Sequence, residues 1–377
     1  MLNPDFIYFD NAATTEPCEA AMSSFLKAAA CFGNPSSAHF LGRESAALLK
    51  TARRQTADAL GADSSEIIFT SGGTEANNLA IQGVCEAGRD TNEIIISAVE
   101  HPSVFRVCRI LRKKGWRIIK INCGLDGSYD EKALKEAVSD RTALVSFMTI
   151  NNETGSVFPV SEIVKTVKNI NPHTLVHTDA VQAFGKADIS VRDSGVDLLS
   201  VSAHKIHGLK GAGALYIKKG TPVYPIQFGG DQESGMRSGT EALPAICALG
   251  AAAETAARHI RDSYKYIQTI QQSILTGLGA FDNVVINSAP GASPYILNFS
   301  VREKNADEIL SAFSERGICI SKGAACKANH AHGPSMLMSF GIETELADNA
   351  LRLSFCENNT PEEADRFLEA ARRIIRS

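Results

Sequence analysis

The sequence lacks the features of a membrane or secreted protein. No run of apolar residues approaches the length needed to span a bilayer, and the N-terminus carries no basic segment followed by an apolar one. The nine cysteines are odd in number, scattered and never spaced as CxxC, which argues against a disulfide framework and a zinc ribbon. We therefore expect a cytoplasmic protein without a membrane segment, in which most cysteines pack in the core.

The chain also has little excess charge of either sign. Its 377 residues include 38 Lys and Arg against 42 Asp and Glu, which gives a net charge of −4. Proteins that bind a phosphate backbone usually show a basic excess or a basic stripe, so we expect no nucleic-acid partner. With 44% hydrophobic and 21% charged residues, the composition is that of an ordinary globular protein.

Short apolar segments alternate with helical patterns over the first two thirds of the chain. The expected strands are residues 66–70, 93–97, 117–121, 142–147, 174–178, 197–201 and 213–217, and the expected helices are residues 74–86, 103–114, 130–138 and 160–169. Apolar strands that alternate with helices predict an α/β fold with a mostly parallel, seven-stranded sheet covered by helices on both faces.

The pattern changes after residue 239. A long Ala-rich helix is expected at residues 243–278, followed by strands at 284–286, 296–301 and 350–355 and by helices at 305–316 and from 361. This order is typical of a smaller α+β domain. We expect a large domain at residues 16–250, and a small one formed by residues 1–15 and 251–377.

Three polar segments follow predicted strands. Ser71-Gly72-Gly73-Thr74-Glu75 opens a helix, and small residues at a helix N-terminus favour a phosphate, although a Gly turn with Thr74 as N-cap fits equally. Asp179 follows an apolar strand, where α/β sheets place ligand sites, although it could cap a following helix. Lys205 follows another strand as a candidate imine-forming amine, although it could be a solvated loop lysine.

Taken together, the three segments fit one cofactor. Pyridoxal phosphate needs a phosphate cup, a carboxylate for its pyridinium nitrogen and a lysine, and the chain supplies them in that order. His101, just past the strand at residues 93–97, could stack on the ring, and Asn152 could hydrogen-bond the ring hydroxyl or the substrate.

On these motifs the sequence resembles the cysteine desulfurases of the class-V aminotransferase superfamily, whose fold is that of fold-type I pyridoxal phosphate enzymes. The matching segments are residues 8–15, 33–37, 70–78, 100–101, 151–153, 177–182, 202–205, 235–240, 323–326 and 351–354. The resemblance implies a homodimer that binds pyridoxal phosphate. It implies a cofactor site of Gly73, Thr74, His101, Asn152, Asp179, Gln182, Ser202, His204, Lys205 and, from the other subunit, Thr240. It further implies that Asn34, Asn152 and Arg352 bind the substrate, with no metal.

The same resemblance makes Cys326 the sulfur acceptor. The segment from Cys326 to Pro334 is long, as in the mobile-loop branch of the desulfurases, and Lys322, Lys327, His330 and His332 favour a thiolate. Metal ligation by Cys326 with the two histidines is an alternative that we do not prefer. The chain departs from the family pattern at Lys322–Ala325, at Leu209 in place of Pro, and at Cys356 in place of Gly.

The expected activity is conversion of L-cysteine to L-alanine, with Lys205 as base, and with a persulfide on Cys326 that passes to a protein acceptor such as an iron–sulfur scaffold or a tRNA-thiolation carrier. A selenocysteine lyase or a small-substrate aminotransferase is the nearest alternative on the same scaffold. A non-catalytic interaction protein is the alternative of another class.

Overall fold

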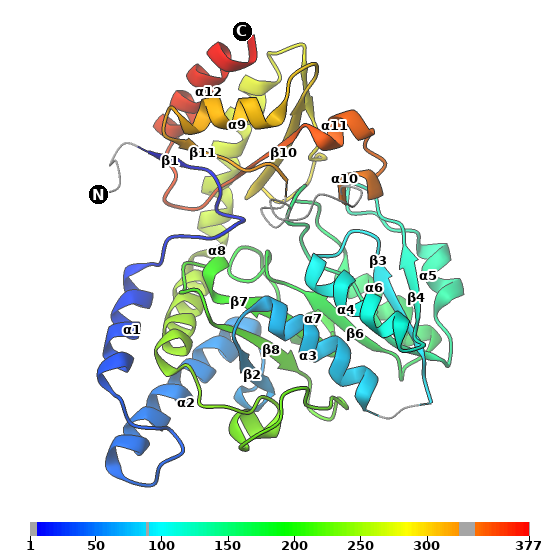
Figure 1. Ribbon diagram of the computed structural model, residues 1–377, viewed down its shortest axis with the longest axis vertical. Coiled ribbons are helices and arrows are strands. Elements are labelled where there is room, and N and C mark those ends of the chain that lie inside the picture. The colour runs from blue at the N-terminus through cyan, green and yellow to red at the C-terminus, as the bar shows by residue number, and fades with distance from the viewer. Residues whose placement is uncertain (1–5, 88–89, 324–335, 377) are drawn as a thin grey trace.

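The larger part of the molecule is a seven-stranded sheet (Figure 1). The computed structural model describes residues 6–87, 90–323 and 336–376. The strand order is β2-β8-β7-β6-β5-β3-β4, and only β8 runs antiparallel to its neighbours. The strands are β2 (Ile67–Thr70), β3 (Glu93–Ser97), β4 (Arg117–Ile121), β5 (Thr142–Ser146), β6 (Leu175–Asp179), β7 (Leu198–Ser202) and β8 (Gly213–Ile217). The predicted α/β class and mostly parallel sheet are confirmed.

Most strands of this sheet are buried along their whole length, which shows that both faces of the sheet are covered. On one face, side chains such as Ile94 and Leu144 pack under α3 (Gly73–Glu86) and α4 (Pro102–Lys113). On the other face lie α2 (Phe40–Leu60), α5 (Glu131–Ala137), α6 (Val160–Ile170), α7 (Val191–Ser194) and part of α8 (Leu243–Leu278). The alternation of strand side chains between faces therefore produces two apolar layers.

The smaller part contains two more sheets. An antiparallel sheet has the order β12-β10-β9, with β9 (Val284–Ile286), β10 (Ile296–Val301) and β12 (Ala350–Ser354). The N-terminal strand β1 (Ile7–Tyr8) pairs in parallel with β11 (Ile318–Cys319), so the start of the chain lies in the C-terminal part (Figure 1). The helices of this part are α9 (Ala306–Ser314), α10 (Met336–Ser339), α11 (Thr344–Asp348) and α12 (Pro361–Arg376).

The helix α8 connects the two parts. Its 36 residues form one uninterrupted helix, whose first half packs against α1 (Glu19–Ala30) and α2. Its second half packs against α12 and β10. Because the helix passes through residue 250 without a break, the division of the chain at residues 15 and 250 stays a prediction.

Most predicted elements are confirmed to within one or two residues at each end. The alternative in which Thr74 is the N-cap of the helix is wrong. The N-cap of α3 is Gly72, without a side-chain cap, and Thr74 is already the second helical residue. The alternative in which Asp179 caps a following helix is also wrong, since Asp179 ends β6 and is followed by turns. Within the described part of the chain, no helix is long and apolar enough to cross a membrane.

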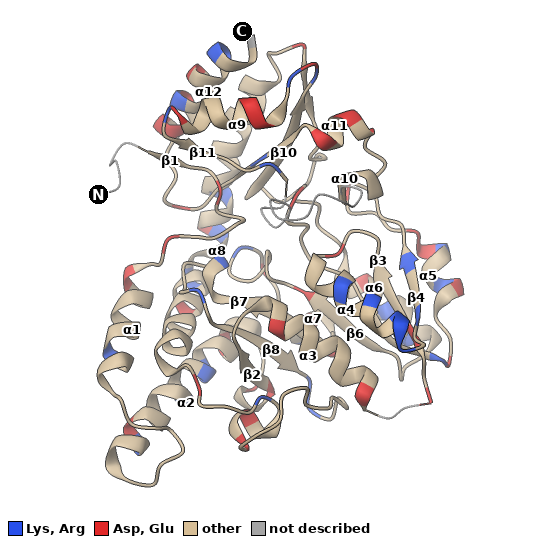
Figure 2. Cartoon of the chain, in the orientation of Figure 1, with Lys and Arg blue, Asp and Glu red and all other residues tan. Residues whose placement is uncertain are grey.

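Charged residues of both signs are spread over most of the surface, with one exception (Figure 2). Residues 106–120, on α4 and β4, carry seven Lys and Arg and no acid. Since β4 is an edge strand, its exposed Arg117 and Lys120 discourage pairing with other chains. The absence of a nucleic-acid partner stays a prediction.

Candidate functional site

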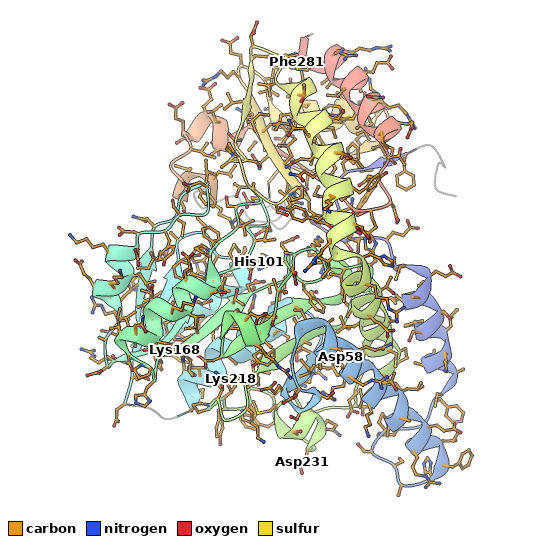
Figure 3. The ribbon with its side chains drawn as sticks, turned by 180° about the vertical axis from the view of Figure 1, so that it is seen from behind. Asp58, His101, Lys168, Lys218, Asp231 and Phe281 are labelled. Atoms are coloured by element: carbon orange, nitrogen blue, oxygen red, sulfur yellow. The ribbon has the colours of Figure 1, made fainter. Side chains whose placement is uncertain are left out.

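A cavity of about 580 Å³ opens where the parallel strands of the large sheet end. Asp179 is the last residue of β6, and Ser202 is the last residue of β7. Such carboxyl ends are where open α/β sheets bind ligands. Ten predicted site residues line this single cavity: Gly73, Thr74, His101, Asn152, Asp179, Gln182, Ser202, His204, Lys205 and Arg352. Figure 3 labels His101 near the middle of the molecule, between its larger and smaller parts.

The N-terminus of α3 forms one end of the cavity. Because Gly72 provides no side-chain cap, the first backbone N–H groups of this 14-residue helix are available to an anion. A Cβ at Gly73 would lie 2.6 Å from Cγ2 of Val181, so a larger residue there would displace Val181. Ser202 and His204 line the cavity at the same end. Burial and the neighbouring Lys205 lower the pKa of His204 to about 4, so its imidazole is neutral near pH 7.

Asp179 is held by a hydrogen-bonded chain that sequence analysis missed. Its Oδ1 accepts from the backbone N–H of Val181 at 3.0 Å, and its Oδ2 accepts from Nδ2 of Asn77 at 2.7 Å. The same amide nitrogen donates to Oγ of Ser103 at 2.8 Å. Ser103 Oγ lies 2.8 Å from Nδ1 of His101. A buried network therefore joins the carboxylate to the imidazole, and both groups face the cavity.

His101 is presented to the cavity as a neutral ring. It is the N-cap of α4, and its Nδ1 accepts from the backbone N–H of Ser103. Burial lowers its pKa, against the opposing effect of Asp179, and Lys205 lowers it further. Since Nδ1 accepts hydrogen bonds, the ring proton lies on Nε2. A neutral, fixed imidazole is suited to contact with an aromatic ligand.

We predict that Asn77→Ala weakens binding of pyridoxal phosphate roughly 10- to 100-fold, because a hydrogen bond to a charged group contributes about 1.5–3 kcal/mol. The dissociation constant is measured by fluorescence titration of the cofactor-free protein. The matched control is Asn78→Ala, since the amide of Asn78 donates to the carbonyl of Thr74 on its own helix. Equal affinity in both variants would show that Asn77 does not position the carboxylate.

Lys205 points at the N-terminal segment of the chain. It ends a 3-10 turn, Ala203–Lys205, directly after β7. Its Nζ donates to the carbonyls of Ala12 at 2.6 Å and Ala13 at 2.7 Å. Nε2 of Gln182 donates to the same Ala12 carbonyl at 3.0 Å. The turn at residues 11–13 therefore forms a wall of the cavity and fixes the direction of the lysine.

Arg352 is the largest fully buried side chain among the described residues. Its Nη2 donates to Oδ1 of Asp10 at 2.8 Å, and its Nη1 donates to the carbonyl of Asn152 at 2.8 Å. Its Nε is buried and has no hydrogen-bond partner among the described residues, and the same holds for Oδ1 of Asn152. Buried polar groups normally have partners, so these two atoms at the cavity wall point to a polar ligand.

Two predicted site residues do not line the cavity of this chain. Asn34 is exposed in the connection between α1 and α2. Thr240 is exposed and lines a small neighbouring hollow. The segment before Thr240 is tied to α3, because Nε of Arg237 donates to Oε1 of Glu75 at 2.8 Å. Both roles stay predictions.

Cys326, with Lys327, His330 and His332, lies outside the described residues. The eight described cysteines are free, and burial raises the thiol pKa of Cys85, Cys108, Cys123, Cys247 and, together with Asp10, of Cys319. Core packing is confirmed for four buried cysteines, but it is wrong for Cys319, which is exposed. None of these five thiols is activated as a thiolate.

The residues that line the cavity fit pyridoxal phosphate. A helix N-terminus with a glycine that leaves no room for a Cβ suits the phosphate. Asp179 keeps lone pairs for a ring N–H, since each of its oxygens has one hydrogen bond in the structure. Arg352 offers a partnerless buried Nε to a carboxylate. Asp10 and Asn77 lie within the motif segments and Ser103 lies two residues after His101, but only the fold shows which groups they contact.

Comparisons with known proteins agree over nearly the whole chain. The family model of class-V aminotransferases matches residues 7–367. A cysteine desulfurase of Gluconacetobacter diazotrophicus is 38% identical, with 98% of this chain and 93% of that protein covered. A solved NifS-like protein has a TM-score of 0.93 at 34% identity, with 98% and 99% covered. The structure of SspA in complex with cysteine has a TM-score of 0.81 at 32% identity, with 94% and 100% covered.

Proposed function

We propose that this chain, which belongs to the cysteine desulfurases of the class-V aminotransferase family, converts L-cysteine to L-alanine and transfers the sulfur to a protein acceptor. The enzymes of this family depend on pyridoxal phosphate. The observation that carries the proposal is the single cavity in which Lys205, Asp179 and Arg352 meet. We place the reaction in the cytoplasm, as expected from the sequence.

We propose that the cofactor is held between the N-terminus of α3 and Asp179, with Lys205 bonded to it and His101 against its ring. When bound, pyridoxal phosphate supplies an electron sink that stabilises negative charge at the amino acid Cα. Asp179, whose two oxygens accept hydrogen bonds from Asn77 and Val181, would pair with the ring nitrogen. The neutral His101 excludes water from one side of the site.

The substrate is held by its carboxylate at Arg352, where Nε is without a partner and Asn152 lies alongside. Lys205 then takes the proton from Cα and returns a proton to the product. The thiolate of Cys326 takes the sulfur of the substrate, so that one thiol and one L-cysteine give one persulfide and one L-alanine. The segment that carries Cys326 is bounded by residues beside this cavity, since Ser321 pairs with Arg352, and Met336 contacts Asn151.

The test is to mix the purified protein with L-cysteine and a thiol reductant, and to measure sulfide and alanine in the same sample. We expect equal amounts of the two products. Amino-group transfer to a keto acid without sulfide would instead identify a small-substrate aminotransferase. Activity confined to selenocysteine would identify a selenocysteine lyase, and a colourless, inactive protein would identify a non-catalytic relative.

We further propose a homodimer, in which the segment at residues 235–240 contributes Thr240 to the neighbour's site. Four large apolar side chains are open to contact with a partner: Leu26, Phe32, Phe40 and Phe228 are 62–82% exposed. We predict a sedimenting species of twice the 40.3 kDa of the chain at micromolar concentration. A fully active monomer would contradict the shared site, because an isologous contact supplies both halves at once.

A further inference from the structure

A second group of reactive side chains lies outside the cavity. His207, Cys356 and Glu357 bring an imidazole nitrogen, a sulfur and a carboxylate oxygen within 4.8 Å of one another. Within residues 6–87, 90–323 and 336–376, no other group of at least three His, Cys, Asp or Glu side chains is placed in this way. His207 and Cys356 are buried, while Glu357 reaches the surface. Cys356 is also where the chain departs from the glycine of its family.

The imidazole of His207 is fixed in an unusual position. The residue has a φ of 63°, which is uncommon outside glycine, and its backbone N–H donates to Oγ1 of Thr15 at 2.7 Å. Its Nδ1 lies 2.7 Å from the carbonyl of Glu16. Because a carbonyl can only accept, Nδ1 carries a proton and donates it. Histidines that bind metals are typically oriented by such a hydrogen bond from their other nitrogen.

The neighbours of the second ring nitrogen require a cation. Nε2 of His207 lies 3.5 Å from Oε2 of Glu357. Against the opposing effect of burial, hydrogen bonds with Cys356 and Glu357 raise the pKa of His207 to about 10, so a proton occupies this place near pH 7 and a metal ion has to displace it. In a tetrahedral zinc site, nitrogen and oxygen ligands are about 3.4 Å apart, given bond lengths of 2.0–2.2 Å. The spacing in the protein therefore already matches one edge of a zinc coordination tetrahedron.

We propose that His207, Cys356 and Glu357 form a zinc site that is separate from the cavity. The imidazole releases its Nε2 proton to solvent and binds as a neutral ligand through Nε2, the thiol releases its proton to solvent and binds as a thiolate, and the carboxylate binds as an anion. The two negative charges balance the charge of Zn²⁺, and a water molecule completes the four ligands on the open side of Glu357. Nitrogen and sulfur ligands favour zinc over magnesium or calcium.

The ion would join two segments that carry cavity residues. His207 follows Lys205 by two residues, and Cys356 follows β12, which carries Arg352. A metal that binds the folded chain and not the unfolded one raises its melting temperature. We expect zinc to stabilise the folded chain in this way. It takes no part in the cavity, since none of its three ligands lines it.

The test is equilibrium dialysis of the protein, loaded with pyridoxal phosphate, against ZnCl₂ in the presence of a competing chelator. We expect one high-affinity zinc per chain, with a single sulfur ligand in the X-ray absorption spectrum and a higher melting temperature. Cys356→Ser should weaken zinc binding at least about 100-fold, because loss of even an outer hydrogen-bond partner of a ligand costs 10- to 100-fold. His207→Gln should weaken zinc binding too. Glu357→Gln should have the same effect and serves as the test if His207→Gln does not fold.

Cys108→Ser is the matched control, since Cys108 is a buried cysteine that belongs to no group of three possible ligands among the described residues, and this variant should bind zinc as the unchanged chain does. Cys326→Ser tests whether zinc binds to the cysteine within residues 324–335 instead. Zinc binding that is absent in the unchanged chain would overturn the proposal and leave His207 and Glu357 as a protonated ion pair. Binding that is lost only in Cys326→Ser, or that survives both Cys356→Ser and Glu357→Gln, would overturn it too.

Discussion

Lys205→Ala should lower the turnover of L-cysteine by at least about 10⁴-fold. A positioned proton-transfer group contributes up to 10⁴-fold by itself, and this residue also provides the amine that bonds to the cofactor. The variant loses the one amine that two backbone carbonyls, those of Ala12 and Ala13, direct into the cavity. The measurement is alanine formation under saturating cysteine, together with mass spectrometry after borohydride reduction of the unchanged protein.

Borohydride should fix the cofactor mass on Lys205 in the unchanged chain, and on no lysine in the variant. Lys218→Ala is the control, because Lys218 is exposed just after β8 and away from His101 (Figure 3), so both activity and labelling should be kept. An adduct on a different lysine, or a Lys205→Ala variant that turns over normally, would refute the assignment of the cofactor lysine.

Cys326→Ala should reduce sulfide release on the order of 10³-fold or more, because removal of a catalytic nucleophile leaves only the residual rate from binding and electrostatics. Binding of cysteine should survive, since Arg352 and Lys205 are unchanged. The spectral change on mixing with cysteine therefore stays while sulfide disappears. Stopped-flow absorbance and a sulfide assay on the same sample separate the two steps.

The control for this experiment is Cys319→Ala. Cys319 is the exposed cysteine of β11, seven residues earlier, but burial and Asp10 raise its thiol pKa, so it is a poor thiolate. We expect normal sulfide release from that variant. Persulfide trapped on Cys319, or unchanged sulfide release in Cys326→Ala, would sink the desulfurase proposal and favour an ordinary aminotransferase.

The fold could be predicted because its sheet is apolar and its helices are amphipathic. Strands such as β2 and β3 are buried throughout and contain the continuous apolar runs 67–69 and 94–96, and α8 was predicted with both ends correct. The cofactor residues could be found because each follows a strand, and parallel strands bring their ends to one edge. Gly73, Asp179 and Lys205 meet for this reason, although 132 positions separate the first from the last.

Contacts between distant segments could not be predicted. Asn77 and Ser103 come from α3 and α4, and only the packing of these helices brings the amide and the hydroxyl together. Although residues 1–15 are predicted to join the C-terminal part, the local sequence carries no signal for the contact of Asp10 with Arg352. The same holds for His207 and Cys356, which are far apart in the sequence and lie together in the fold.

The wall contributed by residues 10–14 has a consequence for biosynthesis. Asp10 is among the first residues to leave the ribosome, yet its partner Arg352 follows 342 positions later. At 5–20 residues per second, the interval is roughly 20 to 70 s. Lys205 is made 147 positions before Arg352, so for roughly the last 7 to 30 s of that interval Ala12 and Ala13 can approach Lys205, while β12 has not been made and the substrate end of the cavity has no arginine. A nascent chain can thus assemble the cofactor end of its site well before it can hold an amino acid there.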